Sequence, residues 1–444
     1  MNDNYTSYRN IFLIAWPIML GSLGQNLIYL IDTSFIGRVG EIELGAAAIG
    51  GIFYFVLFMV GYGLNTGMQV IVARRKGEGA DAAIGEVVDH ELIMILLLAL
   101  TQFSIMYFFS DKLLYFFVQS SLVHEKTSEF LHYRSFGIFF SLINSCLMAF
   151  FVGIGNTRVT TWTTGVLCFV NIILDYLLIF GKFNFPKMGI AGAGLASSIS
   201  EATVTLVIIF YLYRKNFVKL FSLFHFRKMK RALTVKMLSV SSPLVFQQLI
   251  SVGTWFLFFI VIEHLGEREL AISNLVRSLY TFFGIPVWAL ASTTNSMTSN
   301  LLGQGKQEKV IPLIKKIASV SIVFSLVFAA LVNIFPASVL SIYTNEKDLI
   351  IASIPSLRSV TVAITLFSVA VLTIFAVSGT GATRVSLLIE VACIIVYVIY
   401  VYLVAEVFHM SLPVIWLAET VYWVCALLFC SYYLIYGKWS MKKV

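Results

Sequence analysis

The sequence predicts an all-α integral membrane protein of twelve transmembrane helices, in two pseudo-symmetric six-helix bundles that form parallel repeats around a central cleft. Of its 444 residues, 59% are hydrophobic and only 12% are charged, and the mean hydropathy is +0.89. A soluble domain carries about 25% charged residues, so this chain needs lipid as part of its solvent. Its apolar runs are long and continuous, without the alternation that marks a transmembrane β-strand.

About a dozen apolar segments are each long enough to cross ~30 Å of hydrocarbon as a helix. No cleavable signal peptide is expected, because the first ten residues lack a basic stretch and the apolar run after them is too long. The expected spans are 10–36, 46–72, 92–118, 130–154, 160–181, 190–213, 237–264, 270–299, 312–334, 352–378, 384–407 and 411–436.

The basic residues of the loops predict the orientation. With the amino terminus in the cytoplasm, the cytoplasmic segments hold about threefold more Lys and Arg than the opposite side. Both termini are therefore expected in the cytoplasm, and the short tails favour a prokaryotic cytoplasmic (inner) membrane. The net charge of +8 follows from this topology. The charge does not indicate a nucleic-acid-binding surface, because the basic residues are scattered over many loops.

The chain is an internal duplication with a constant offset of 226 residues. Pro17 aligns with Pro243, and the other matches gather at three turns. Six helices separate equivalent positions, so sidedness is preserved and the repeats are parallel. The aligned turns are 40–44 with 266–270, 77–79 with 303–305, and 153–159 with 379–385. We expect an N-terminal bundle at 1–213, a cytoplasmic basic linker at 214–236 and a C-terminal bundle at 237–444, whose cleft can switch access by rocking.

Three acidic residues fall inside apolar segments of the first half: Asp32, Asp175 and Glu201. An ionised carboxylate at the bilayer centre costs roughly 2.5–3.5 kcal/mol, so we expect these acids to bind something cationic. The duplicate positions hold Phe258, Val401 and Leu427. The polar chemistry is therefore concentrated in the N-terminal bundle, and the chain is expected to be a transporter.

Each acid has a neutral polar residue on the same helix face. Gln25 and Asp32 are seven residues apart, whereas Asn171 precedes Asp175, and Ser197 precedes Glu201, by four. Such groups suit either a proton or a desolvated Na⁺. Asn171 and Gln25 have an alternative role as interhelical hydrogen-bond partners, and Glu201 an alternative role as a structural partner. The roles of Glu390, Glu419 and Arg277 in the second half stay open.

Several motifs resemble those of the multidrug and toxic compound extrusion (MATE) transporters across essentially the whole chain. These motifs are IDTSFIGRVG (31–40), RRKGEG (74–79), LLGQGK (301–306), GIGNTR (153–158), GTGATR (379–384), NIILDYLLIFG (171–181) and GIAGAGLASSIS (189–200). The resemblance implies twelve helices in two bundles. It also implies export of amphipathic, often cationic, compounds in exchange for H⁺ or Na⁺ by alternating access.

One branch of that family couples transport through an N-terminal cluster, and its pattern matches here at Pro17, Gln25, Asp32, Asn171 and Asp175. Ser197 stands near the place where the family commonly has Thr. Another branch has a Glu about eight residues after the proline of helix 7, where this chain has Ser251. We therefore expect cation coupling and substrate binding at Asp32, Asp175, Asn171, Gln25, Ser197 and Glu201. Na⁺ has possible ligands in Asp32, Asn171 and Asp175, and Pro17 gives helix 1 a place to bend.

Two other functional classes are alternatives. A flippase for lipid-linked oligosaccharide or other polyprenyl-linked precursors shares the related fold, but it would need a basic cavity, and the intramembrane charges here are mainly acidic. A membrane-embedded enzyme would need a His-based or metal site. The six histidines lie in loops or at span ends, without the H-E-x-x-H spacing. We expect no enzyme activity, no cofactor beyond the coupling ion, no nucleic-acid partner, contact with membrane lipids, and a monomer.

Overall fold

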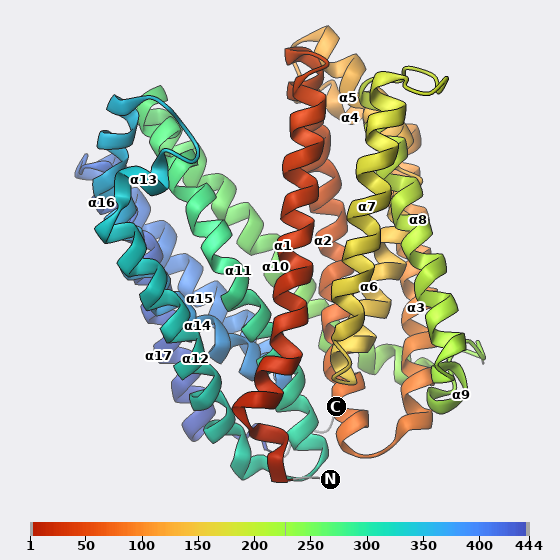
Figure 1. Cartoon of the computed structure of the whole chain (residues 1–444). Coiled ribbons are helices and arrows are strands. Elements are labelled where there is room, and N and C mark those ends of the chain that lie inside the picture. Colours follow the sequence, from red (N-terminus) through yellow and green to blue (C-terminus); the bar gives the residue numbers. More distant parts are fainter. Residues whose placement is uncertain (1–2, 227, 441–444) are drawn as a thin grey trace. The chain divides into compact units, whose positions relative to one another are not determined.

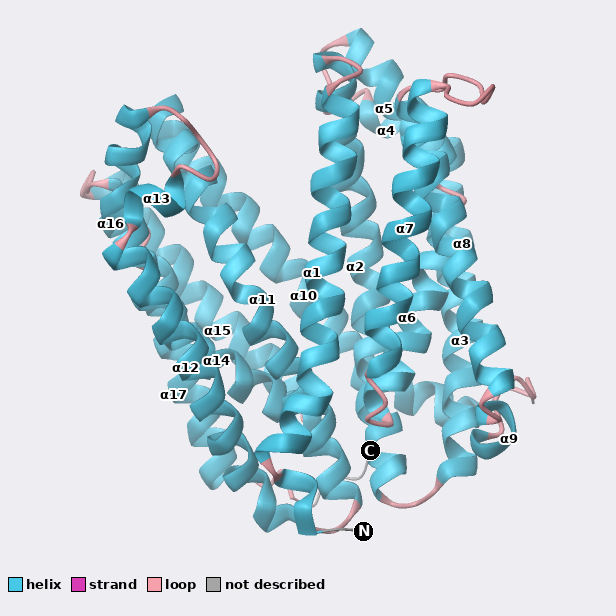
Figure 2. Cartoon of the chain, viewed as in Figure 1, coloured by secondary structure: helices cyan, strands magenta, loops and turns pink. Residues whose placement is uncertain are grey.

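A computed structural model describes residues 3–226 and 228–440, and these residues are helices joined by short loops, without a β-strand (Figure 2). Eleven helices are long and apolar enough to cross a membrane, and a twelfth span consists of α5 and α6, which meet at a bend of 53°. The predicted all-α membrane fold with twelve spans is confirmed. The span predicted at 130–154 is this bent pair, whose first helix begins earlier, at Ser121.

The chain divides into two compact units, which are described separately. The first, here called the amino-terminal unit, is Trp16–Val245. Its elements, of which the α-helices are labelled in Figure 1, are α1 (Tyr8–Gly37, from Trp16 on), α2 (Glu41–Gly77), α3 (Asp81–Ser104), a π-helical turn η2 (Ile105–Phe109), α4 (Ser110–Leu114), α5 (Ser121–Arg134), α6 (Gly137–Gly153), α7 (Arg158–Phe180), α8 (Ile190–Arg214), α9 (Phe217–Phe221) and the start of α10 (Arg231–Leu265).

The carboxy-terminal unit is Phe246–Val444 together with Met1–Ala15. Within the described residues it holds η1 (Asp3–Thr6), the start of α1, the rest of α10, α11 (Glu267–Gly303), η3 (Gln307–Lys309), α12 (Val310–Ile334), α13 (Pro336–Leu340), α14 (Lys347–Gly379), α15 (Thr383–Tyr402), the π-helical turn η4 (Leu403–Val407), α16 (Leu412–Ile415) and α17 (Ala418–Tyr436). Its central helix is α14, which packs against α11, α12 and α17.

The boundaries of the units lie inside α1 and α10, whereas the sequence analysis drew its boundary at the loop 214–236. Close packing explains the difference at α10. A Cβ placed on Gly63 would lie 2.7 Å from Cα of Val245, and the Ser241 hydroxyl donates to the Leu64 carbonyl at 3.2 Å. The first part of α10 is therefore held against α2.

The loop 214–236 is hydrogen-bonded to α3. It contains α9, and both carboxylate oxygens of Asp89 accept backbone hydrogen bonds from it. The donors are the backbone N–H groups of Phe224 at 2.7 Å, His225 at 2.8 Å and Phe226 at 2.9 Å. His90 accepts a further bond from the Lys230 backbone at 2.9 Å. The basic loop is thus a docked part of the amino-terminal unit.

The duplication reappears in backbone geometry. Gly79 and its partner Gly305 have φ of +73° and +72°, and Gly155 and Gly381 have +77° and +85°. This left-handed region favours glycine because a Cβ would be crowded there. Each half therefore leaves α2 or α11, and α6 or α14, through the same kind of turn.

Candidate functional site

Helices α1 and α7 bring three of the predicted residues together in the amino-terminal unit. With its amide nitrogen toward the acids, Asn171 donates to Oδ1 of Asp32 at 2.9 Å and to Oδ2 of Asp175 at 3.3 Å. The two carboxyl groups also lie within hydrogen-bonding reach of each other. Asn171 and Asp175 share a face of α7 because they are one turn apart, and that face meets α1 at Asp32.

This carboxylate pair is shielded from solvent unequally. Asp175 is fully buried, Asn171 is 1% exposed, and Asp32 is partly exposed. Oδ1 of Asp175 is buried without a hydrogen-bond partner. A buried acceptor without a partner carries a free-energy cost, and a proton or a cation placed between the two carboxylates would remove it.

Glu201 faces a different partner, which the sequence analysis missed. Its carboxylate receives two short hydrogen bonds from Arg134 of α5, at 2.6 and 2.8 Å, in an ion pair that is mostly buried. Such bidentate Arg–carboxylate pairs fix the relative orientation of the two side chains. A signal was present in the sequence: Arg134 is the single Lys or Arg of the span predicted at 130–154. A cation-coupling role for Glu201 stays a prediction, made for a carboxylate that is already paired.

The bend between α5 and α6 makes room for this arginine. A Cβ on Gly137 would lie 2.3 Å from Nη1 of Arg134 and 2.7 Å from Oε2 of Glu201. On another side, the guanidinium lies 3.9 Å from the ring centre of Tyr54, a distance at which a cation–π attraction acts. The charge of Arg134 is also within electrostatic range of Asp32 and Asp175. The site thus contains a fixed positive charge beside its acids.

The remaining predicted residues lie on the same helices without described contacts to the carboxylate pair. Gln25 on α1 is exposed, and Ser197 on α8 is partly buried. Pro17 lies inside α1, where its carbonyl accepts a hydrogen bond from Thr161 of α7 at 3.0 Å. The structure therefore joins Asp32, Asn171 and Asp175 directly and leaves the roles of Gln25, Ser197 and Pro17 as predictions.

A further buried acid, Glu91 on α3, was also missed. It is fully buried, and neither of its carboxylate oxygens has a hydrogen-bond partner in the described part of the chain. The expected span 92–118 began one residue after it, whereas α3 begins at Asp81. An ionised carboxylate without a partner in such surroundings is costly.

The carboxy-terminal unit contains two buried acids of its own. Glu419 on α17 accepts hydrogen bonds from Tyr280 at 3.3 Å and Tyr397 at 3.2 Å. Glu390 on α15 is 4% exposed and accepts hydrogen bonds from Tyr422, Ser251 and Gln247. Arg277 lies over the Phe259 ring at 4.8 Å and donates to Asn274 at 3.0 Å. These acids are therefore satisfied by neutral donors.

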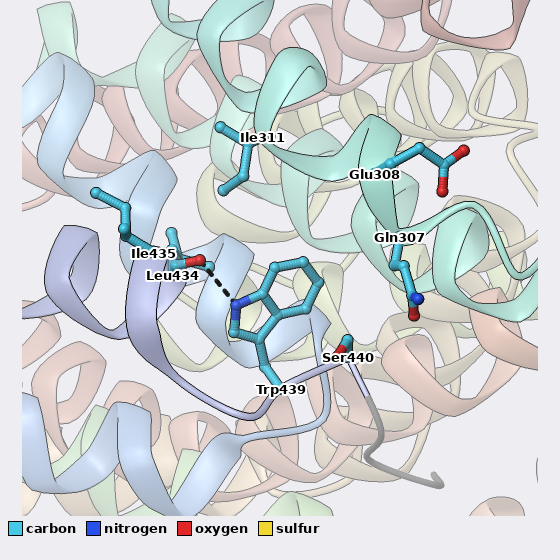
Figure 3. A pocket seen from close by; sticks show the side chains of 7 residues that line it. All are labelled: Gln307, Glu308, Ile311, Leu434, Ile435, Trp439 and Ser440. Atoms are coloured by element: carbon cyan, nitrogen blue, oxygen red, sulfur yellow. Dashed lines mark hydrogen bonds between the residues drawn. The ribbon is translucent and has the colours of Figure 1, made fainter.

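An open pocket of about 530 Å³ occupies the end of this unit where α12 begins and α17 ends (Figure 3). The Trp439 indole stands inside it and donates to the Leu434 carbonyl at 2.8 Å. Its other lining residues are Gln307, Glu308, Ile311, Ile435 and Ser440. None of the predicted site residues lines this pocket, so we do not assign the transport site to it.

The chain is similar to known proteins both in sequence and in structure. The MatE family model matches the chain twice, at residues 17–177 and 243–403. The two matches begin at Pro17 and Pro243 and are related by the same offset of 226 residues that the internal repeat shows. The duplication inferred from single residues is therefore also present at the level of the family model.

Among curated relatives, a probable multidrug resistance protein NorM of Photorhabdus laumondii is 22% identical over 359 residues, which are 79% of this chain and 77% of the relative. One of Bacillus subtilis is 30% identical over 208 residues, or 47% of this chain and 46% of the relative. Among solved structures, a MOP superfamily transporter of Pyrococcus furiosus matches with a TM-score of 0.89 and 21% identity. That match covers 98% of this chain and 96% of the other. An outward-facing multidrug resistance MATE family transporter matches with a TM-score of 0.88 and 21% identity over 97% and 96% of the chains.

Proposed function

This chain belongs to the MatE family of multidrug and toxic compound extrusion transporters, and we propose that it exports amphipathic, often cationic, compounds by antiport against H⁺ or Na⁺. Members of this family are transporters and not enzymes, and the chain is an integral membrane protein that crosses the bilayer many times. Relatives named as multidrug resistance proteins support export as the direction of transport. The proposal concerns the coupling ion, the substrates and the residues that link them.

The observation that carries the proposal is the meeting of Asp32, Asn171 and Asp175. Two carboxylates at such close range repel each other in a medium of low dielectric, so a proton or a Na⁺ between them is favourable. Asn171 can serve both states of the site. Its amide nitrogen donates to the carboxylates when no cation is bound, and a turn of the amide presents its oxygen as a ligand for Na⁺.

Exchange follows from competition for negative charge. A coupling cation on the Asp32–Asp175 pair cancels the charge that attracts a cationic substrate, so the loaded site releases the compound outward. Each cation that returns inward through a potential of 100 mV supplies ~2.3 kcal/mol. Pro17 lacks an N–H group and cannot complete the α-helical ladder, and we assign to it the bend of α1 that accompanies the change of access.

We place the protein in a prokaryotic cytoplasmic membrane, as a monomer with both termini in the cytoplasm. The loops with many Lys and Arg then face the cytoplasm, as the positive-inside rule requires. The basic loop 214–236 lies next to anionic lipid headgroups in this orientation. Cationic substrates and membrane lipids are the partners that this arrangement implies.

The decisive experiment is ethidium efflux from proteoliposomes under an imposed pH gradient and, separately, an imposed Na⁺ gradient. Asp32→Asn and Asp175→Asn should each lower the initial rate about tenfold or more, since a lost interaction of ~1.4 kcal/mol already gives that factor. The gradient that drives the wild-type protein identifies the coupling ion.

Asp111→Asn is the matched control, because the Asp111 side chain is 72% exposed and lies far along the chain from both acids. Its rate should equal that of the wild type. Efflux at wild-type rates in the Asp32→Asn and Asp175→Asn proteins would remove the pair from the mechanism. Absence of efflux under either gradient, with translocation of polyprenyl-linked sugar instead, would favour the flippase alternative.

A further inference from the structure

A buried carboxylate in the carboxy-terminal unit has no place in the mechanism above. Glu390 lies on α15 and is 4% exposed, and its described partners come from two other helices. Oε1 accepts hydrogen bonds from the Tyr422 hydroxyl at 2.6 Å and from the Ser251 hydroxyl at 2.7 Å, and Oε2 accepts one from the Gln247 amide at 3.4 Å. None of these partners carries a positive charge.

This lack of a counter-ion distinguishes Glu390 from Glu201. A buried ion is normally retained only with an opposite charge beside it, and Glu201 has Arg134 for that purpose. The titratable groups near Glu390 are Tyr422 on α17 and the thiols of Cys393, Cys425 and Cys430 on α15 and α17. The Glu419 carboxylate interacts electrostatically with Tyr422. All of these groups are neutral or negative, so only a bound cation can compensate the charge of Glu390.

The short contacts suit a proton as that cation. The Tyr422 and Ser251 hydroxyl oxygens lie 2.6 and 2.7 Å from Oε1, which is the spacing of direct O–H···O hydrogen bonds, so a proton fits this arrangement without moving the oxygens. The Ser251 hydroxyl has one hydrogen but two possible acceptors, Oε1 of Glu390 at 2.7 Å and the Gln247 carbonyl at 2.9 Å.

Two complete arrangements follow from this count. When Glu390 is ionised, Tyr422 and Ser251 both donate to Oε1. When Glu390 carries a proton on Oε1, it donates to Ser251, which turns its own hydrogen to the Gln247 carbonyl. Neither arrangement leaves a buried donor unpaired. The Gln247 side-chain oxygen is meanwhile held by the Ser386 hydroxyl at 3.3 Å, which Ser378 contacts at 3.0 Å.

The equivalent positions of the first half cannot do this. Glu390 aligns with Thr164, Ser251 with Gln25, and Gln247 with Gly21 in the repeat. In the amino-terminal unit, Gly21 and Gly24 pack directly on Thr164. Positions at which small residues pack together in the first half therefore hold a polar network with one carboxylate in the second half.

We propose that Glu390, with Ser251, Tyr422 and Gln247, is a second proton-binding site, located in the carboxy-terminal unit and independent of the Asp32–Asp175 pair. Proton binding at Glu390 does not require the proposed transport function. A role of this proton in transport rests on that function: if a second proton returns with each transported compound, a given proton gradient supports a steeper gradient of the compound.

The test is infrared difference spectroscopy of the purified protein between acidic and alkaline buffer, in the band of protonated carboxyl groups. Glu390→Gln, which keeps the size and hydrogen-bonding capacity of the side chain, should remove one component of that band, and Asp32→Asn should remove another. Tyr422→Phe should change the frequency of the Glu390 component, because the carboxyl group loses the hydrogen bond that Tyr422 donates to Oε1. Glu346→Gln, which changes an exposed acid of the same unit, should leave the Glu390 component in place.

A band that is identical in the Glu390→Gln and wild-type proteins over the whole pH range would overturn the proposal, whatever the transport assays give. If Glu390→Gln loses its component, the same protein in liposomes should support a smaller steady ethidium gradient than the wild type at equal imposed pH gradient. Loss of the infrared component without any efflux in the wild type would leave the proton site standing and refute the proposed transport function instead.

Discussion

Asp175 and Glu201 are both acids within apolar helices, yet their surroundings give them different chemistry. Glu201 is held by two charge-assisted bonds from Arg134, whereas Asp175 has one oxygen without a partner and a second acid within reach. The sequence places the two acids in one group, because every ionised carboxylate inside a membrane span is costly and such residues are rare. It could not separate them, because the partner of Glu201 lies 67 residues away.

The ion pair yields a stability prediction. Arg134→Leu should lower the free energy of unfolding by about 3–5 kcal/mol, because it leaves the Glu201 carboxylate buried and unpaired. Arg134→Leu combined with Glu201→Leu should recover most of that loss, since no buried charge then remains. The apparent melting temperature of the detergent-solubilised protein measures both.

Lys126→Leu is the control on the same helix, where the pair with Glu129 at 2.7 Å is more exposed. Such surface pairs contribute at most about 1 kcal/mol, so its melting temperature should stay close to that of the wild type. A double variant less stable than Arg134→Leu alone would show that the pair stabilises the fold by more than mutual neutralisation.

At the scale of the element, α3 combines a membrane span with an anchor for the loop that joins the halves. Its acidic and imidazole groups at Asp89 and His90 accept four backbone hydrogen bonds from residues 224–230. From the sequence, this region is predicted only as a cytoplasmic basic linker. Composition indicated the charge of the loop, but the tie to α3 depends on how the loop folds back.

Removing that anchor should free the loop. In Asp89→Ala three backbone N–H groups lose a charged acceptor, each bond contributing about 1.5–3 kcal/mol, so trypsin should cut after Lys228 and Lys230 about tenfold faster or more. Limited proteolysis followed by mass spectrometry gives the rates. Asp81→Asn, on the same helix but paired with Lys76, should be cut at the wild-type rate, and equal rates in all three proteins would contradict the anchoring role.

At the scale of the whole molecule, two halves share a scaffold and differ in chemistry. The family model matches both halves at one offset, and the paired glycines adopt the same left-handed turns. The acids do not repeat: the Asp32 position holds Phe258, which is part of the apolar core of the carboxy-terminal unit. A duplicated fold therefore supports two unlike polar sites, because backbone turns and helix lengths can be kept while interior side chains diverge.

Orientation is the prediction at this scale. In a background without the five native cysteines, Glu346→Cys should react with a membrane-impermeant thiol reagent in intact cells, and Glu308→Cys should react only after the membrane is opened. The excess of basic residues on the Glu308 side is the reason. The reverse pattern of labelling would invert the assigned topology.

The sequence by itself determined the class of fold, the number of spans, the duplication and the residues Asp32, Asn171 and Asp175. These are properties of apolar length, of repeat offset and of spacing along single helices, all of which are local. Only the tertiary structure decided that Arg134 pairs with Glu201, that Glu390 meets Ser251 and Tyr422, and that the compact units divide within α1 and α10. Those outcomes depend on how each helix is rotated about its axis and which neighbour it contacts, and these are set by packing across the whole bundle.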